Sequence, residues 1–172
     1  MNFTKTNPKG IDKEIGKIQS LLHEELDWEN IDVYGRVYKN QSTDKGLVPE
    51  FYIGANEYKD AFLNDAKTAT ICFIEDEKHT TENGIYYYSD VKIVVMVNLS
   101  KAKPSILHRA DTEVQIDVIK QSEKNKMFTI TGIEKGIANV FKGFNVQGIL
   151  LTDMQPFHVF AITGTLKYKI NC

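Results

Sequence analysis

The residues able to do chemistry in this sequence are few, and the first candidates lie near its C-terminal end. His158 follows Asp153 at short range and Cys172 is the last residue, so a Cys–His–Asp relay for nucleophilic catalysis has to be considered. Fourteen residues of extended strand would place Cys172 roughly 46 Å from His158. The relay therefore fails within one subunit, and no catalytic residues are predicted.

A second candidate is the acidic stretch Glu75-Asp76-Glu77, with His79 close behind it. Such a loop would bind a divalent cation if its ligands stood at set offsets around a glycine, as in the EF-hand, but that pattern is absent. The stretch is interpreted as the solvated tip of a hairpin that ends in Asn83-Gly84. No metal site is predicted. No cofactor is predicted either, because Gly132, Gly136 and Gly143 lack the spacing of a phosphate-binding loop.

Three successive tyrosines, Tyr86, Tyr87 and Tyr88, are harder to assign to the core. On a strand Tyr87 points away from the other two, so at least one ring faces outward. Exposed aromatic rings are enriched where proteins meet proteins. Sheet packing is the default interpretation, and a subunit interface is the alternative. The predicted interface residues are Glu75, Asp76, Glu77, Tyr86, Tyr87 and Tyr88.

These residues need a sheet to position them, and the sheet is predicted around the terminal strand. After Pro156 the sequence alternates, with apolar residues from Phe160 to Ile170 on one face and more polar residues on the other. The strand from Tyr86 to Asn98 has two apolar faces in its second half and is predicted to be central and covered on both sides. Shorter strands are predicted at residues 31–38, 51–53 and 68–74.

Helices are predicted to cover this sheet. Apolar residues recur at helical spacing from Ile11 to Leu26, and Trp28 is expected to pack under the end of that helix. Residues 109–121 fit either a strand or a helix, and the acidic opening at Asp111 favours the helix. Further short helices are predicted at residues 57–64 and, from a Thr131-x-x-Glu134 capping box, at residues 131–144. Residues 40–46 are predicted to be a polar loop.

Composition limits the class of protein. The chain is 42% hydrophobic and 26% charged, with a formal net charge of −2, so disorder and a global nucleic-acid-binding field are excluded. No apolar run reaches the roughly 20 residues that a membrane helix needs. Two cysteines without ligand spacing favour synthesis in a reducing cytoplasm. The predicted fold is one α+β domain over residues 1–172, with a mixed, mainly antiparallel sheet, the N-terminal amphipathic helix and two or three further helices packed on it.

The order of elements, together with a few short strings, resembles the neck and tail-end proteins of tailed bacteriophages, the tail terminator and head–tail joining group. The strings are Glu57-Tyr58-Lys59-Asp60, Val97-Asn98-Leu99, His108-Arg109-Ala110-Asp111 and Asp153-Met154-Gln155-Pro156. The resemblance implies a non-enzymatic virion protein, made in the host bacterial cytoplasm, whose copies form a ring. Its other partners would be neck, tail-tube or portal-side proteins, with non-specific proximity to DNA in the channel and no membrane contact.

Two other functions stay open. One is a soluble α+β module that binds a peptide or small ligand in a pocket between the N-terminal helix and the sheet. The other is a hydrolase that uses His158 or His79, for which the partner residues are missing.

Overall fold

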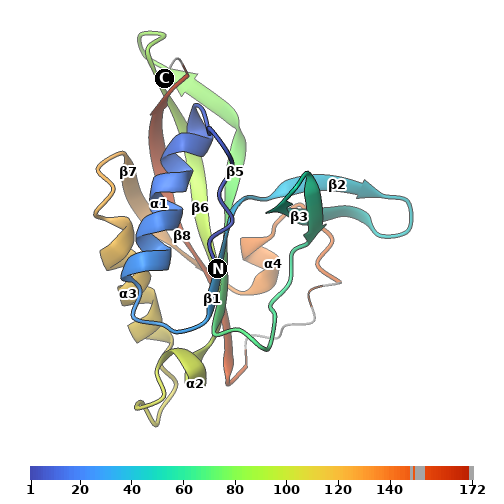
Figure 1. The fold of residues 1–172 in the computed structure, drawn as a ribbon, viewed down its shortest axis with the longest axis vertical. Coiled ribbons are helices and arrows are strands. Elements are labelled where there is room, and N and C mark those ends of the chain that lie inside the picture. The colour runs from blue at the N-terminus through green and yellow to red at the C-terminus, as the bar shows by residue number, and fades with distance from the viewer. Residues whose placement is uncertain (148, 150–153, 171–172) are drawn as a thin grey trace.

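A five-stranded sheet with the order β1-β5-β6-β8-β7 forms the centre of the protein (Figure 1). The computed structural model describes residues 1–147, 149 and 154–170. β1 runs parallel to β5, and every other neighbouring pair is antiparallel. The strands of this sheet are β1 (Ile31–Arg36), β5 (Ala69–Thr81), β6 (Tyr86–Asn98), β7 (Phe128–Lys135) and β8 (Phe157–Lys169).

β6 and β8 lie inside the sheet, as their patterns predict. β6 and β8 pair along their whole length, from Tyr86 opposite Lys169 to Asn98 opposite Phe157. Val95 and Phe160 point to one face and Val94 and Ala161 to the other, and all four are fully buried. β8 carries the predicted buried face, while its other face is apolar near Val159 and Ala161 and becomes polar only from Thr163 onward.

Helices cover one face of the sheet. α1 (Ile11–Glu25) lays Ile15, Ile18 and Leu22 against it, as its helical spacing predicts. α3 (Asp111–Ser122) lies beside α1, which decides the ambiguous segment in favour of a helix. Trp28 is buried between them, and its Nε1 donates a hydrogen bond to Asp117 Oδ2 at 3.0 Å. The short helix α2 (Leu99–Ala102) follows β6 directly.

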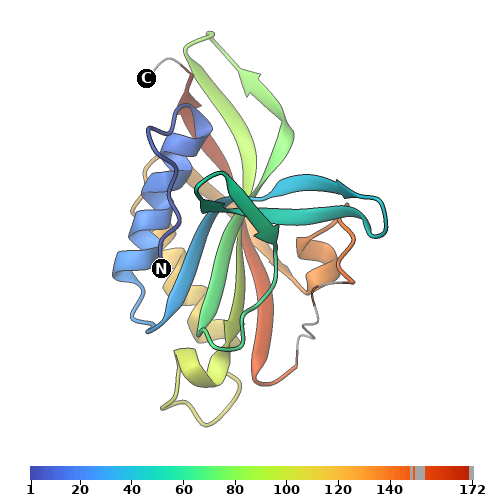
Figure 2. The ribbon, with the colours of Figure 1, turned by 45° about the vertical axis from the view of Figure 1, so that its right-hand side comes forward.

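A smaller sheet and a short helix cover the opposite face (Figures 1 and 2). The small sheet has the order β2-β3-β4, and its Phe51 packs in a second apolar cluster with Cys72, Met96 and Phe141. Its β2–β3 hairpin extends away from the central sheet in both views. The elements on this face are β2 (Tyr38–Ser42), β3 (Gly46–Gly54), β4 (Glu57–Asp60) and α4 (Ile137–Val140).

The predicted α+β class with a mixed, mainly antiparallel sheet is confirmed, and the described residues form four helices. No helix in the described part of the chain is long and apolar enough to span a membrane.

Two predicted helices are wrong. Residues 57–64 begin as β4, because Ala55 and Asn56 adopt positive φ values of 52° and 63° and turn the chain back onto β3. Tyr58 and Phe62 are consequently exposed rather than inward, and only Ala61 is buried.

The capping-box prediction at Thr131 fails for a different reason. Residues 128–135 form β7, because pairing with the long strand β8 outweighs a local capping preference. Thr131 Oγ1 contacts Thr163 Oγ1 at 3.3 Å, and Glu134 pairs with Lys92, so neither side chain caps a helix. Helix α4 begins only at Ile137.

Two predicted loops are also shorter than expected. Residues 40–42 of the predicted polar loop belong to β2, which begins at Tyr38, the last residue of the predicted strand 31–38, and pairs with β3 through the turn at residues 43–45. The acidic stretch from Glu75 onward belongs to β5, which continues to Thr81, so the solvated turn is confined to residues 82–85.

Candidate functional site

The six predicted interface residues lie on two adjoining strands. Strands β5 and β6 continue past the edge strand β1, whose pairing with β5 stops at Phe73, and form a distal hairpin of residues 75–91. Glu75, Asp76 and Glu77 come from one strand of the distal hairpin, and Tyr86 to Tyr88 come from the other. The whole segment 76–85 is exposed.

An irregularity at the base of the distal hairpin separates Glu75 from its two neighbours. The register shifts between Glu75, which lies opposite Val91, and His79, which lies opposite Ser89. Within the shift Asp76 Oδ1 accepts a hydrogen bond from the backbone N–H of Lys78 at 3.2 Å, and Glu77 pairs with Lys39 of β2. Such a bulge bends a strand and re-aims its side chains.

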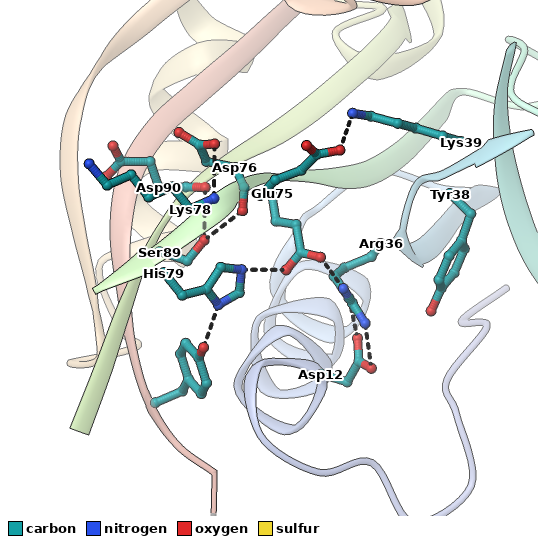
Figure 3. Close-up of polar contacts among 12 residues, drawn as sticks. Asp12, Arg36, Tyr38, Lys39, Glu75, Asp76, Lys78, His79, Ser89 and Asp90 are labelled. Carbon is teal, nitrogen blue, oxygen red and sulfur yellow. Dashed lines mark hydrogen bonds and ion pairs between the residues drawn. The ribbon is translucent and has the colours of Figure 1, made fainter. Parts of the chain in front are cut away.

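Glu75 points inward, into a chain of ion pairs that joins the distal hairpin to α1 (Figure 3). The Arg36 guanidinium donates to Glu75 on one side and to Asp12 on the other, with Nε–Oδ1 and Nη2–Oδ2 distances of 2.7 and 3.0 Å. Lys5 donates a further hydrogen bond to Asp12 Oδ2 at 2.7 Å. Four segments of the chain therefore meet at one partly buried cluster.

The electrostatics of this cluster follow from its geometry. Burial by itself would raise the pKa of Asp12, but hydrogen bonds from Arg36 and Lys5 outweigh it and hold the pKa below its usual value. Burial opposes the charge on Arg36, and Asp12 more than compensates, so the pKa of Arg36 is raised. Asp12 and Arg36 are therefore both charged at neutral pH.

His79 extends the cluster to the terminal strand. Its Nδ1 is hydrogen-bonded to the Tyr168 hydroxyl, and its Nε2 lies 3.6 Å from Glu75 Oε2. Burial raises the pKa of Tyr168, and the nearby Glu75 carboxylate adds to the effect, so the phenol stays protonated at neutral pH. Glu75 also pairs with Arg36. The hydrogen bond between His79 and Tyr168 therefore joins the distal hairpin and its ion pairs to β8.

The three tyrosines divide as alternation predicts. Tyr87 lies on the helix-covered face, where its ring packs against Tyr168 with centroids 5.9 Å apart. Tyr86 lies on the opposite face beneath two lysines of β8, with Lys167 Nζ at 4.1 Å and Lys169 Nζ at 4.7 Å from its ring centroid. Tyr88 is also within cation–π range of Lys167, at 5.8 Å.

His158 is buried and contacts two polar side chains. It is 1% exposed beneath α3, where its Nε2 lies 2.8 Å from Gln115 Nε2 and its Nδ1 lies 3.3 Å from Arg109 Nη2. The other two members of the imagined relay, Asp153 and Cys172, lie outside the described residues. Burial raises the pKa of Cys72 and makes its thiol a poor nucleophile.

Two hollows lie on the face opposite α1, and a smaller one of about 60 Å³ lies between the start of α1 and strands β6 and β8. One of about 760 Å³ opens over the polar half of the sheet, and a smaller one of about 180 Å³ lies beside β3. The apolar face of α1 is packed directly onto the sheet. Within the described ranges, no group of three or more His, Cys, Asp or Glu side chains is arranged to hold a metal ion. The larger hollow is lined by charged residues that include Glu75, Asp76, Asp90, Lys92, Glu134 and Lys142.

Comparison with family models, curated proteins and solved structures gave no significant match for this chain.

The sequence located the distal hairpin but not what anchors it. Asp12 and Arg36 are 24 residues apart, and Tyr168 lies 89 residues from its partner His79. No local sequence pattern predicts these long-range contacts, because each of the four residues has the pattern of an ordinary polar residue on its own helix or strand. The one available sign was Arg36, a charged residue at the end of an otherwise buried strand.

Proposed function

We propose that this protein is a non-enzymatic structural subunit of a tailed-phage particle, and that its copies form a ring at the neck or tail end. The observation that carries the proposal is the pair of hairpins that extend from the body, the β2–β3 arm and the distal hairpin (Figure 2). An isolated two-stranded hairpin is marginally stable in water. Here β8 pairs with residues 86–91 of the distal hairpin and ion pairs hold its base, while its tip is exposed and available for a neighbouring subunit.

The particle assignment rests on the sequence resemblance, and the fold supports it through its class and its extensions. A ligand-binding module is less well supported, because the larger hollow is open and lined by charges rather than apolar with a few convergent polar groups. A hollow of about 60 Å³ does lie at the expected place, between the start of α1 and strands β6 and β8, but it is small for a ligand site and half of its lining residues are charged.

Light scattering and electron microscopy of the purified protein over a wide concentration range test the proposal. Closed rings of one size are expected, since a head-to-tail interface closes when its rotation divides the circle. The charge reversal Glu82→Lys at the exposed tip should abolish assembly while the subunit stays folded, because this side chain is not buried. The matched change Glu24→Lys, at an exposed position away from the tip, should assemble normally. Rings of normal size from the tip variant would contradict a role for the distal hairpin.

A further inference from the structure

The two edges of the central sheet differ in how far they are protected against pairing with another strand. On the β1 side the N-terminal segment covers the edge: Phe3 N donates to Val33 O, and Val33 N donates to Met1 O, both at 2.8 Å. Farther along the same side, the uncovered part of β5 has its bulge and the charged residues Glu77 and Lys78. Covering segments, bulges and charges are the usual means by which proteins prevent unwanted strand pairing.

The β7 edge has little of this protection. β7 is the last strand of the sheet, and nothing in the described part of the chain pairs beyond it. Residues 128–133, Phe-Thr-Ile-Thr-Gly-Ile, form an uncharged run rich in strand-favouring residues. Ile133 is 43% exposed beside this edge. A bulge interrupts the register between Ile130 and Gly132 but places no charge there. The outward backbone groups of residues 128–133 are therefore open to another strand, while farther along β7 the carbonyl of Lys135 accepts a hydrogen bond from Asn139 Nδ2 at 3.0 Å.

A suitable strand lies on the other side of the same molecule. β2 is the outer strand of the arm, and among the described residues its only strand partner is β3. In Figure 1 the arm reaches out on the side of the molecule opposite β7. The one charged residue of β2, Lys39, pairs with Glu77 of β5, and the residues that follow it, Asn40 and Gln41, are uncharged and exposed, as is the turn at residues 43–45.

We propose that β2 of one copy pairs with the β7 edge of the next copy, so that the subunits join head to tail by strand addition. Only an extended segment satisfies an unpaired strand edge along its length, which specifies a strand as the occupant. A second copy is favoured because the arm and the open edge lie on opposite sides of one subunit, and the same contact then repeats around a closed ring. The inference rests on the proposed ring and names its interface.

Ile133→Lys tests the contact, because pairing would bring the new ammonium group against an incoming strand. Ile116→Lys is the matched control: Ile116 is 42% exposed, nearly the same as Ile133, but lies on α3. The concentration at which rings form should rise at least tenfold for Ile133→Lys and stay at the wild-type value for Ile116→Lys. Equal assembly of the two variants overturns the proposal.

Cross-linking gives a readout that needs no disruptive change. Gln41→Cys and Thr131→Cys are made as separate proteins in a Cys172→Ser background, where the remaining Cys72 is fully buried. Mixing the two under mild oxidation should yield a disulfide-linked pair, whereas Gln41→Cys mixed with Glu24→Cys should not. If rings form without this cross-link and also form from Ile133→Lys, the proposed β2–β7 interface is wrong, while the proposed ring is retained. A wild-type protein that stays monomeric at all concentrations overturns both the ring and its interface.

Discussion

At the scale of single residues, Asp12 is expected to contribute to stability through its ion pairs. Its carboxylate is 17% exposed and receives hydrogen bonds from two cations, so Asp12→Asn removes the carboxylate that pairs with Lys5 and one of the two carboxylates that pair with Arg36. Hydrogen bonds to charged groups are worth roughly 1.5–3 kcal/mol, and we expect a loss of about 2 kcal/mol at pH 7. Urea unfolding followed by the fluorescence of the single tryptophan, Trp28, measures it. Glu24→Gln on the exposed side of α1 is the control and should change stability by less than about 0.5 kcal/mol.

The pKa of Asp12 also gives a pH dependence with a definite sign. Because its folded-state pKa lies below the unfolded value near 3.9, the stability that Asp12 contributes is fully present above that value. It is lost as the pH falls through the folded-state pKa. The difference in unfolding free energy between wild type and Asp12→Asn should therefore shrink when the pH is lowered from 7 to 3. A difference that is constant across this range would show that Asp12 titrates alike in the folded and unfolded protein.

At the scale of elements, substitution by alanine is expected to change stability in opposite directions at two glycines, Gly164 and Gly16. A Cβ on Gly164 of β8 would lie 2.5 Å from both the Phe128 ring and Thr129 O on β7, so Gly164→Ala must push these strands apart. Overpacking of this kind costs about 1–3 kcal/mol. A Cβ on Gly16 of α1 meets nothing within 4 Å, and Gly16→Ala should stabilise the helix by about 0.5–1 kcal/mol. Thermal unfolding of the two variants decides this, and a stabilising Gly164→Ala would show that β7 packs differently on β8.

The elements that the sequence predicts well are those whose pattern is long. β6 and β8 alternate over many residues, and α1 repeats its apolar stripe through four turns, so a local preference of one or two residues cannot mask them. The failures are short segments. At Thr131 a capping signal of four residues competes with pairing to β8, and the bulge there disturbs the alternation that would have revealed a strand. The fold class is therefore readable from the sequence, while β4 and β7 are not.

The candidate site shows the same limit. Tyr86 and Tyr88 are correctly placed on one face by alternation alone. The ion pairs that hold the distal hairpin depend on α1, β1 and β5 meeting in space, which no local spacing encodes. Glu75 was grouped with Asp76 and Glu77 as a surface residue, but the bulge after it turns its side chain toward Arg36 instead.

At the scale of the whole molecule, the structure predicts a gradient of local stability along β5 and β6. Residues 69–73 and 93–98 lie between two covered faces, whereas residues 76–85 are exposed and have covering layers on neither side. Amide hydrogen exchange reports the free energy of local opening. In the dilute subunit, peptides from the covered region should exchange most slowly, and peptides from the distal hairpin should exchange orders of magnitude faster.

The same experiment repeated above the assembly concentration separates subunit contacts from intrinsic stability. If the distal hairpin contacts a neighbour, its amides should become protected on assembly, because an interface removes them from water as burial does within one chain. The covered parts of β5 and β6 serve as the internal control, since they are protected already and should not change. If residues 38–46 of the arm and the residues of β7 become protected together, pairing of β2 with β7 of the next copy is a second contact between subunits. Protection that does not change anywhere along the chain with concentration would mean that the subunits do not associate, and both the ring and its contacts would have to be abandoned.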